Sequence, residues 1–182
     1  MPIEFAFLDY LQTLHTPWLD SLMLFITAAT DKGLAGIVLC LVLLARKSSR
    51  KVGVAMFLAL IIGYALGSGI LKPFFARVRP CNVNLALDML IKRPASYSFP
   101  SGHTTLTFCA VMTLYFARWR KLFAVSAVVG ALVCVSRMYL YVHFPTDILA
   151  GACVGTLSAY VAWKSINSYF LTNFLACVKI RK

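Results

Sequence analysis

Long apolar stretches alternate with short polar segments along most of the chain. A membrane-spanning helix needs ~20 mainly apolar residues, and six stretches reach or approach that length. The shorter ones must extend into flanking polar residues or cross a thinned region of bilayer. The pattern therefore predicts an all-α integral membrane protein, a six-helix transmembrane bundle with spans at residues 18–30, 33–45, 52–71, 101–117, 122–136 and 146–169.

The apolar residues 3–14 are interrupted by acidic and amide side chains, a mixture typical of a helix lying at the membrane interface. The first residues, Met-Pro-Ile-Glu-Phe, lack a basic region, so no cleavable signal peptide is expected. The chain shows no internal repeat and no linker. We therefore expect residues 1–182 to form a single transmembrane domain that begins with an interfacial helix.

Composition argues against a water-soluble protein. Hydrophobic residues make up 60% of the chain, charged residues 13%, and the mean hydropathy is +0.80. The net charge of +12 could suggest nucleic acid as a partner. The cations, however, lie in short clusters between apolar runs and not on one basic face with interleaved aromatics. We expect membrane lipids, not nucleic acid, as partners, and cysteines that pack in the core instead of forming disulfides.

The basic clusters predict which side of the membrane each loop occupies. Clusters at residues 46–51, 118–121 and 179–182 fall on one side of a six-span bundle, and the positive-inside rule makes that side cytoplasmic. The connections after the third and fifth spans then lie on the opposite side. Because these two connections hold most of the polar residues expected to face the bundle interior, they predict a site at the extracytoplasmic face.

The first polar segment contains two cations at the end of the third span. Lys72 and Arg79 are two helical turns apart, so on a continuing helix they would project from nearly the same side. Pro73 and Pro80 disfavour that continuation. Two cations here could bind one anion, and snorkelling toward lipid headgroups is the alternative.

The second polar segment, Pro100-Ser101-Gly102-His103, predicts the start of a helix. Ser101 is a favourable N-cap, and Gly102 lets a ligand approach the backbone. The free N–H groups of a helix start form a natural phosphate site, and His103 would stand beside it in the first turn. The alternative is a capped helix with an interfacial histidine.

The third polar segment joins a cation to a histidine and a carboxylate. Arg137 ends the fifth span, and His143 precedes Asp147 by four residues at the start of the sixth. This spacing allows the carboxylate to hold one ring nitrogen and leaves the other free as a nucleophile. A purely structural pair is the alternative, since a carboxylate at the edge of a span needs a partner.

A metal site is the competing use of two histidines and an aspartate, because three such ligands can bind zinc. Three cations, Lys72, Arg79 and Arg137, would converge on the same space. They would repel a metal ion and attract an anion. We therefore expect no metal ligands and no cofactor.

Together the three segments resemble the signature of the type-2 phosphatidic acid phosphatase superfamily. That signature is Lys, six residues, Arg-Pro; then Pro-Ser-Gly-His; then Ser-Arg, five residues, His, three residues, Asp. Every position is filled, from Lys72 to Asp147, and the resemblance covers about residues 50–160. The soluble vanadium-dependent haloperoxidases share the signature, but the apolar spans favour the membrane branch, in which the chain resembles small bacterial undecaprenyl-diphosphate phosphatases.

The resemblance implies a role for each matched residue. His143 would attack phosphorus and form a phosphohistidine, and Asp147 would orient and charge its ring. His103 would protonate the departing lipid oxygen and later activate water. Fixed positive charge would serve in place of magnesium, and a covalent step divides one difficult displacement into two. The phosphate would be bound by Lys72, Arg79, Ser101, the Gly102 backbone and Arg137.

The resemblance further implies a metal-independent phosphatase of lipid phosphates or diphosphates in the bacterial plasma membrane. Undecaprenyl diphosphate is the favoured substrate, with phosphatidylglycerol phosphate, phosphatidic acid and lipid A phosphates as alternatives. A small anion transporter is the alternative from another class, although the centres of the second to fifth spans lack ionisable groups. The sequence leaves open the organism, the oligomeric state and the part that Arg77, Lys92 and Arg93 play in headgroup selection.

Overall fold

The computed structural model describes residues 2–180, without the side chains of Lys32 and of residues 170–180. No β-strand occurs among these residues, so the all-α class is confirmed. The elements in chain order are α1 (Pro2–Gln12), α2 (Pro17–Ala29), the 3-10 turn η1 (Asp31–Gly33), α3 (Leu34–Ala45), α4 (Arg50–Tyr64), the π-helical η2 (Ala65–Leu71), α5 (Lys72–Phe75), α6 (Pro80–Val83), α7 (Gly102–Phe116), α8 (Arg120–Tyr139) and α9 (Pro145–Ile180).

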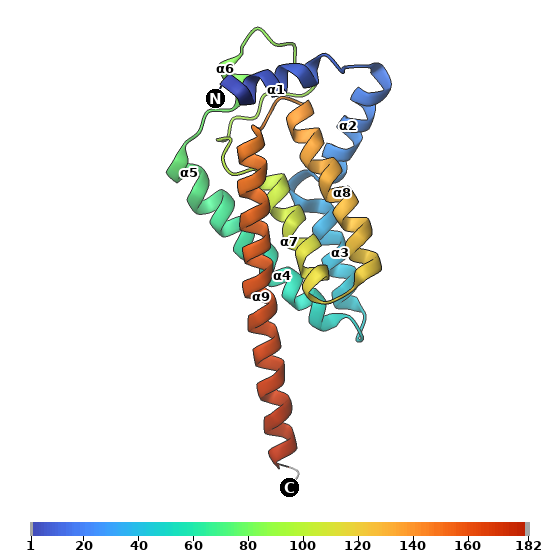
Figure 1. The fold of residues 1–182 in the computed structure, drawn as a ribbon. Coiled ribbons are helices and arrows are strands. Elements are labelled where there is room, and N and C mark those ends of the chain that lie inside the picture. Colours follow the sequence, from blue (N-terminus) through green and yellow to red (C-terminus); the bar gives the residue numbers. More distant parts are fainter. Residues whose placement is uncertain (1, 181–182) are drawn as a thin grey trace.

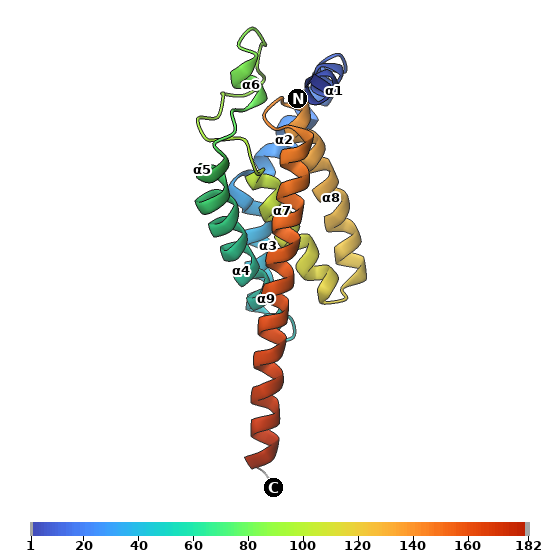
Figure 2. The same ribbon diagram turned by 60° about the vertical axis from the view of Figure 1, so that its left-hand side comes forward.

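Helix α7 is the centre of the bundle and contacts α3, α4, α8 and α9 (Figures 1 and 2). Figure 1 shows α4 rising toward the end that carries α1 and α6, α7 descending from it, α8 rising again and α9 descending. The connections from α5 to α7 and from α8 to α9 therefore meet at one end of the bundle. The connections from α3 to α4 and from α7 to α8 lie at the other.

The first two predicted spans form one bent path. Helices α2 and α3 have 13 and 12 residues and are inclined by 47° across η1. In Figure 1, α3 continues away from the end where α1 lies. At 1.5 Å per residue neither helix exceeds about 20 Å, which is less than the ~30 Å of a hydrocarbon core. The count of six separate spans is therefore not confirmed.

Length and apolar composition identify two candidate spans among the described residues, Arg50–Val83 and Arg120–Tyr139. The bent pair of α2 and α3 would make a third. These helices are long and apolar enough to cross a membrane.

Helix α1 lies across one end of the bundle and is bound there by its polar side chains (Figure 1). Asp9 Oδ1 accepts a hydrogen bond from the Tyr141 hydroxyl at 2.6 Å, and Gln12 Nε2 donates to the Tyr139 carbonyl at 2.9 Å. Leu8 on the same helix is completely buried. Two of the polar residues that interrupt this apolar segment thus bind the last residue of α8 and the loop that follows it.

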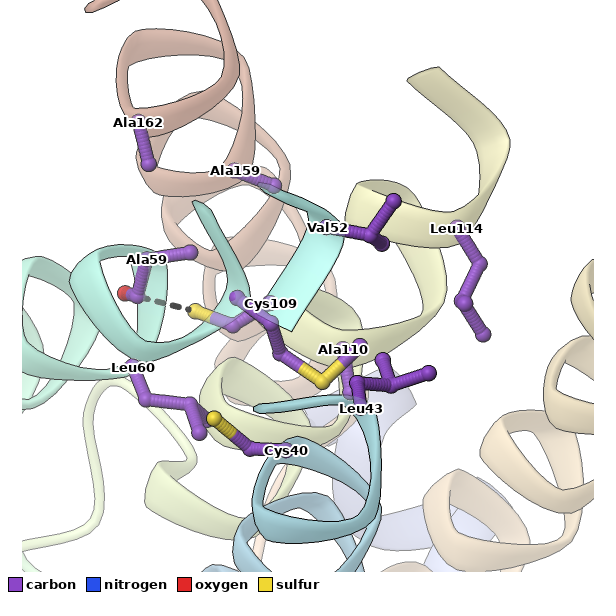
Figure 3. Packing of buried hydrophobic residues seen from close by; sticks show 11 residues of the cluster. Cys40, Leu43, Val52, Ala59, Leu60, Cys109, Ala110, Leu114, Ala159 and Ala162 are labelled. Carbon is purple, nitrogen blue, oxygen red and sulfur yellow. Dashed lines mark hydrogen bonds between the residues drawn. The ribbon is translucent and has the colours of Figure 1, made fainter. Parts of the chain in front are cut away.

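A hydrophobic cluster fills the space between α3, α4, α7 and α9, and Figure 3 shows its members. Cys109 of α7 donates through its thiol to the Ala59 carbonyl of α4 at 3.2 Å. Alanines 59, 159 and 162 let α4 and α9 approach closely, as small residues do in membrane bundles. Cys40 is also buried in this cluster. Cys40, Cys81 and Cys109 are buried, as the packing prediction requires, whereas Cys134 is half-buried and Cys153 is exposed.

Two glycines bring α9 against the start of α7. A Cβ atom on Gly151 would lie 2.7 Å from the Ser101 carbonyl oxygen, and one on Gly155 would collide with the Thr105 carbonyl. Only glycine permits this approach. One result is that the Ser101 N–H donates to the Asp147 carbonyl at 3.0 Å, so that the second and third polar segments touch.

Candidate active site

The three polar segments meet around a cavity of about 580 Å³ at the end of the bundle where α6 lies. Two of the predicted site residues, Ser101 and Asp147, are fully buried beside it. The other six predicted residues line the cavity: Lys72, Arg79, Gly102, His103, Arg137 and His143. Parts of the segment before α7 and of α2 and η1 complete the wall. The fold thus brings together residues that are up to 75 positions apart in the sequence.

The first pair of cations reaches the cavity from a turn and not from one continuous helix. Helix α5 ends at Phe75, because Ala76 adopts a left-handed conformation with φ of 44°. Arg79 then has extended backbone angles. Lys72 and Arg79 therefore do not share one helical face: the helix breaks between them, as Pro73 and Pro80 indicated.

Backbone and hydroxyl oxygens hold both cations in place. Lys72 Nζ donates to the Tyr97 carbonyl at 2.7 Å. Arg79 donates to the Ser96 carbonyl at 2.7 Å and to the Val142 carbonyl at 2.9 Å. Neither cation has a carboxylate among these partners, so both charges are available to an anion in the cavity.

Arg137 brings a third cation from the end of α8. Its side chain is buried, and Nη1 donates to the Thr27 hydroxyl of α2. Its Nε is buried with no hydrogen-bond partner among the described residues. An unpaired buried N–H is costly, so this group favours an acceptor entering the cavity, such as a phosphate oxygen.

The two ring nitrogens of His143 have different partners. Nδ1 lies 3.5 Å from Asp147 Oδ2 and 3.4 Å from the Ser98 hydroxyl oxygen, whereas Nε2 lies 3.1 Å from Arg79 Nη1. Because an arginine nitrogen can only donate, Nε2 must be the acceptor and the ring hydrogen must be on Nδ1. This tautomer leaves the lone pair of Nε2 on the side of Arg79 and the cavity.

Burial holds the pKa of His143 well below its ordinary value, because desolvation penalises the charged ring. The hydrogen bond to Asp147 opposes this shift, and the positive charges of Arg79 and Arg137 reinforce it. The ring is therefore neutral at neutral pH, the only form in which Nε2 can act as a nucleophile.

Asp147 is buried in the first turn of α9, and both of its oxygens are hydrogen-bonded. Oδ1 accepts from Arg77 Nη1 at 2.6 Å. Oδ2 accepts from the Phe144 N–H at 2.9 Å and from the Ser98 hydroxyl. A buried carboxylate is stable only with such partners. Neither Arg77 nor Ser98 is among the site residues predicted from the sequence.

The start of α7 faces the cavity through Gly102. Ser101 caps the helix, and its hydroxyl oxygen accepts from the Thr104 N–H at 3.5 Å. A Cβ on Gly102 would meet only Ser68 Oγ at 3.7 Å and Lys72 Cε at 4.0 Å, so a ligand has room beside this backbone. The structure therefore puts the Gly102 backbone, but not the Ser101 side chain, on the cavity wall.

His103 has a partner that sequence reasoning missed. Its Nε2 lies 3.4 Å from Oδ1 of Asp31, which belongs to η1. A carboxylate at this distance can accept a hydrogen bond from the ring. The only signal in the sequence was an acidic residue between two short apolar stretches, which does not identify His103 as its partner.

The sequence and the fold both match known proteins. The sequence model of the PAP2 superfamily matches residues 49–170. The undecaprenyl-diphosphatase of Sulfolobus acidocaldarius is 30% identical over 120 residues, 66% of this chain and 58% of that protein. The putative undecaprenyl-diphosphatase YbjG of Escherichia coli is 31% identical over 160 residues, 83% of this chain and 77% of that protein.

A solved structure extends the match to nearly the whole chain. The transmembrane PAP2-type phosphatidylglycerolphosphate phosphatase from Bacillus subtilis superposes with a TM-score of 0.75 at 25% identity. The superposition covers 92% of this chain and 86% of that protein. Since the family's sequence model covers most of the described helices and the fold is shared, this chain belongs to the PAP2 superfamily.

Proposed function

We propose that this protein is a lipid phosphatase that transfers the phosphoryl group to His143 and needs no metal ion. The observation that carries the proposal is the geometry of His143, whose Nδ1 faces Asp147 and whose Nε2 lies beside a cavity lined by cations. The names of the relatives, undecaprenyl-diphosphatase and phosphatidylglycerolphosphate phosphatase, support a lipid phosphate or diphosphate as substrate.

In the first step, the phosphoryl oxygens bind to the three cations and to the N–H groups at the start of α7. Arg79 exchanges its contact with Nε2 of His143 for a phosphoryl oxygen, which frees the lone pair. Nε2 attacks phosphorus, the bond from phosphorus to the lipid oxygen breaks, and His103 gives that oxygen a proton. As positive charge develops on the His143 ring, Asp147 stabilises it through Nδ1–H.

In the second step, water replaces the lipid product. His103, now neutral, removes a proton from the water while the water oxygen attacks phosphorus. The bond between phosphorus and Nε2 breaks, and its electron pair returns to His143. Inorganic phosphate leaves, and each histidine recovers its starting protonation state, so the cycle is balanced.

We place the cavity at the extracytoplasmic face of a bacterial plasma membrane. The basic loops at residues 46–51 and 118–121 lie at the end of the bundle away from α6, and cytoplasmic loops are enriched in Lys and Arg (Figure 1). Helix α1 also exposes Ile3, Phe7 and Tyr10, which suits contact with the membrane interface. Undecaprenyl diphosphate is the favoured substrate, ahead of phosphatidylglycerol phosphate, phosphatidic acid and lipid A phosphates.

Metal independence follows from the three cavity cations, which supply the charge that magnesium supplies in other phosphoryl-transfer enzymes. Purified protein should hydrolyse undecaprenyl diphosphate or phosphatidic acid at an undiminished rate in excess EDTA. Vanadate, which mimics the trigonal-bipyramidal phosphoryl group, should inhibit it. Loss of phosphate release on chelation, with recovery on addition of magnesium or zinc, would overturn the metal-free mechanism.

Orientation can be tested by cysteine labelling in intact cells, in an active variant whose native cysteines have been replaced. Ala95→Cys is on the exposed loop before α7, close to Lys92, and should react with an impermeant maleimide. Arg120→Cys, exposed at the start of α8, should react only after the membrane is opened. The reverse pattern would put the cavity on the cytoplasmic side.

A further inference from the structure

Arg77 lies behind the histidine–aspartate pair and not in the phosphate cavity. It is not among the residues that line that cavity; it lines a separate, mainly aromatic one. Its guanidinium carbon is 4.1 Å from the centre of the Phe144 ring, and its side chain is 16% exposed. A substrate phosphate bound among the cavity cations would therefore not be in contact with Arg77.

Arg77 makes two contacts that fix Asp147. Nη1 donates to Asp147 Oδ1 at 2.6 Å, so the carboxylate is held by an ion pair on the oxygen that does not face His143. The Arg77 carbonyl also accepts from the Ser98 N–H at 2.8 Å, and the Ser98 hydroxyl donates to Asp147 Oδ2. Arg77 thus holds Oδ1 of Asp147 directly and Oδ2 through Ser98.

Glu4 of α1 completes the arrangement from the other side. Its Oε2 accepts from Arg77 Nη2 at 2.8 Å, and its Oε1 accepts from the Thr146 hydroxyl at 2.6 Å. Burial raises the pKa of Glu4, but the hydrogen bonds from Thr146 and Arg77 outweigh it and hold the pKa below its ordinary value. Glu4 is therefore ionised at neutral pH and shares the charge of Arg77 with Asp147.

We propose that Arg77, held in turn by Glu4, is a positioning residue that keeps Asp147 aimed at His143 and so couples the N-terminal helix to the nucleophile. The chain of contacts runs from Glu4 through Arg77 and Asp147 to His143. Arg77 thereby sets the orientation of the nucleophile and takes no part in headgroup selection. This inference rests on the proposed function, because only a nucleophilic His143 needs such orientation.

Arg77→Gln removes the charge and leaves a shorter, polar side chain. It should lower kcat by about 10- to 100-fold, the scale of a misoriented catalytic group. The loss should be equal for phosphatidic acid and undecaprenyl diphosphate, with KM nearly unchanged, since the cavity cations are intact. A residue that selects headgroups would instead raise KM for one of the two lipids. Arg77→Lys, which restores the charge with a single contact, should recover part of kcat.

A double-mutant cycle separates positioning from a general loss of structure. In an Asp147→Asn background, Arg77→Gln should cost little further kcat, because the carboxylate that Arg77 supports is already gone. A merely structural role would give the full additional loss in that background. Thermal unfolding and competitive inhibition by inorganic phosphate, which reports on the cavity cations, should be close to wild type in Arg77→Gln. Arg93→Gln is the matched control, since the hydrogen bonds of Arg93 to described residues all go to nearby carbonyls, those of Asn84, Leu85 and Leu87.

The role of α1 is tested by a matched pair of substitutions on that helix. Glu4→Gln weakens the contact with Arg77 and should lower kcat, though less than Arg77→Gln, because Arg77 still binds Asp147. Asp9→Asn weakens a comparable α1 contact, the 2.6 Å hydrogen bond that Asp9 accepts from Tyr141, and should leave kcat near wild type. Equal losses in both variants would mean that docking of α1, and not the Glu4–Arg77 pair, matters.

The outcomes distinguish this inference from the proposed function. If the wild type hydrolyses none of the lipid phosphates, the proposed function fails. If the wild type is active and Arg77→Gln keeps its kcat or changes only KM, the phosphatase stands and the positioning role of Arg77 is refuted.

Discussion

His143→Ala should lower the hydrolysis of a lipid phosphate on the order of 10³-fold or more, because it deletes the atom that attacks phosphorus. Asp147→Asn should be milder, since it misorients and uncharges the ring without removing it. The measurement is phosphate release from undecaprenyl diphosphate and phosphatidic acid at saturating lipid. Retention of more than a tenth of the wild-type rate in His143→Ala would contradict a nucleophilic role.

His15 provides a matched control for this substitution. It is stacked on Tyr139 at a ring separation of 4.3 Å, lies 3.1 Å from Asp20, and is not part of the cavity wall. His15→Ala should therefore leave turnover near wild type. Loss of activity in both alanine variants would indicate general sensitivity of the fold to histidine removal.

His103→Ala should lower the hydrolysis of lipid monophosphates by about 10²- to 10⁴-fold, the usual range for a general acid or base. In the phosphorylation step, His103→Ala should lower the rate less for an aryl phosphate or a diphosphate than for a lipid monophosphate. A good leaving group departs more readily without being protonated. The measurement is the burst of leaving-group release in single turnover, which reports on that step alone.

The dependence on leaving group is what identifies the role of His103. If His103→Ala slows the single-turnover release of every leaving group by the same factor, His103 is not the general acid. That result would point to a role in binding the substrate. Asp31→Asn, which removes the carboxylate 3.4 Å from the ring, should show a smaller loss with the same dependence on leaving group.

Most of the helices could be predicted because an apolar run of membrane length has few alternatives. The predicted spans at residues 52–71, 101–117 and 122–136 correspond to α4 with η2, α7 and α8. The stretches at residues 18–30 and 33–45 could not be paired correctly from hydropathy. Hydropathy shows that both stretches are apolar. It does not show that the 3-10 turn η1 joins α2 to α3 so that the two helices run on in one bent path.

The predicted site residues share a local pattern, whereas the missed ones are linked only by the fold. Ser101 at a helix start and His143 four residues before Asp147 can be recognised within a few positions of sequence. Arg77 contacts Asp147 from 70 positions away, and Ser98 does so from 49. Nothing in a single sequence ties an arginine between two prolines to so distant a carboxylate, so these positions required the structure.

The central claim, a phosphohistidine on His143, is tested most directly by trapping it. Wild-type protein mixed with undecaprenyl diphosphate labelled with ³²P at its terminal phosphate, then quenched in base within one turnover, should carry label that is stable to base and labile to acid. Peptide mapping should assign the label to His143, and His143→Ala should carry none. Label of the same stability on His143→Ala, or mapping to another residue in the wild type, would contradict the claim.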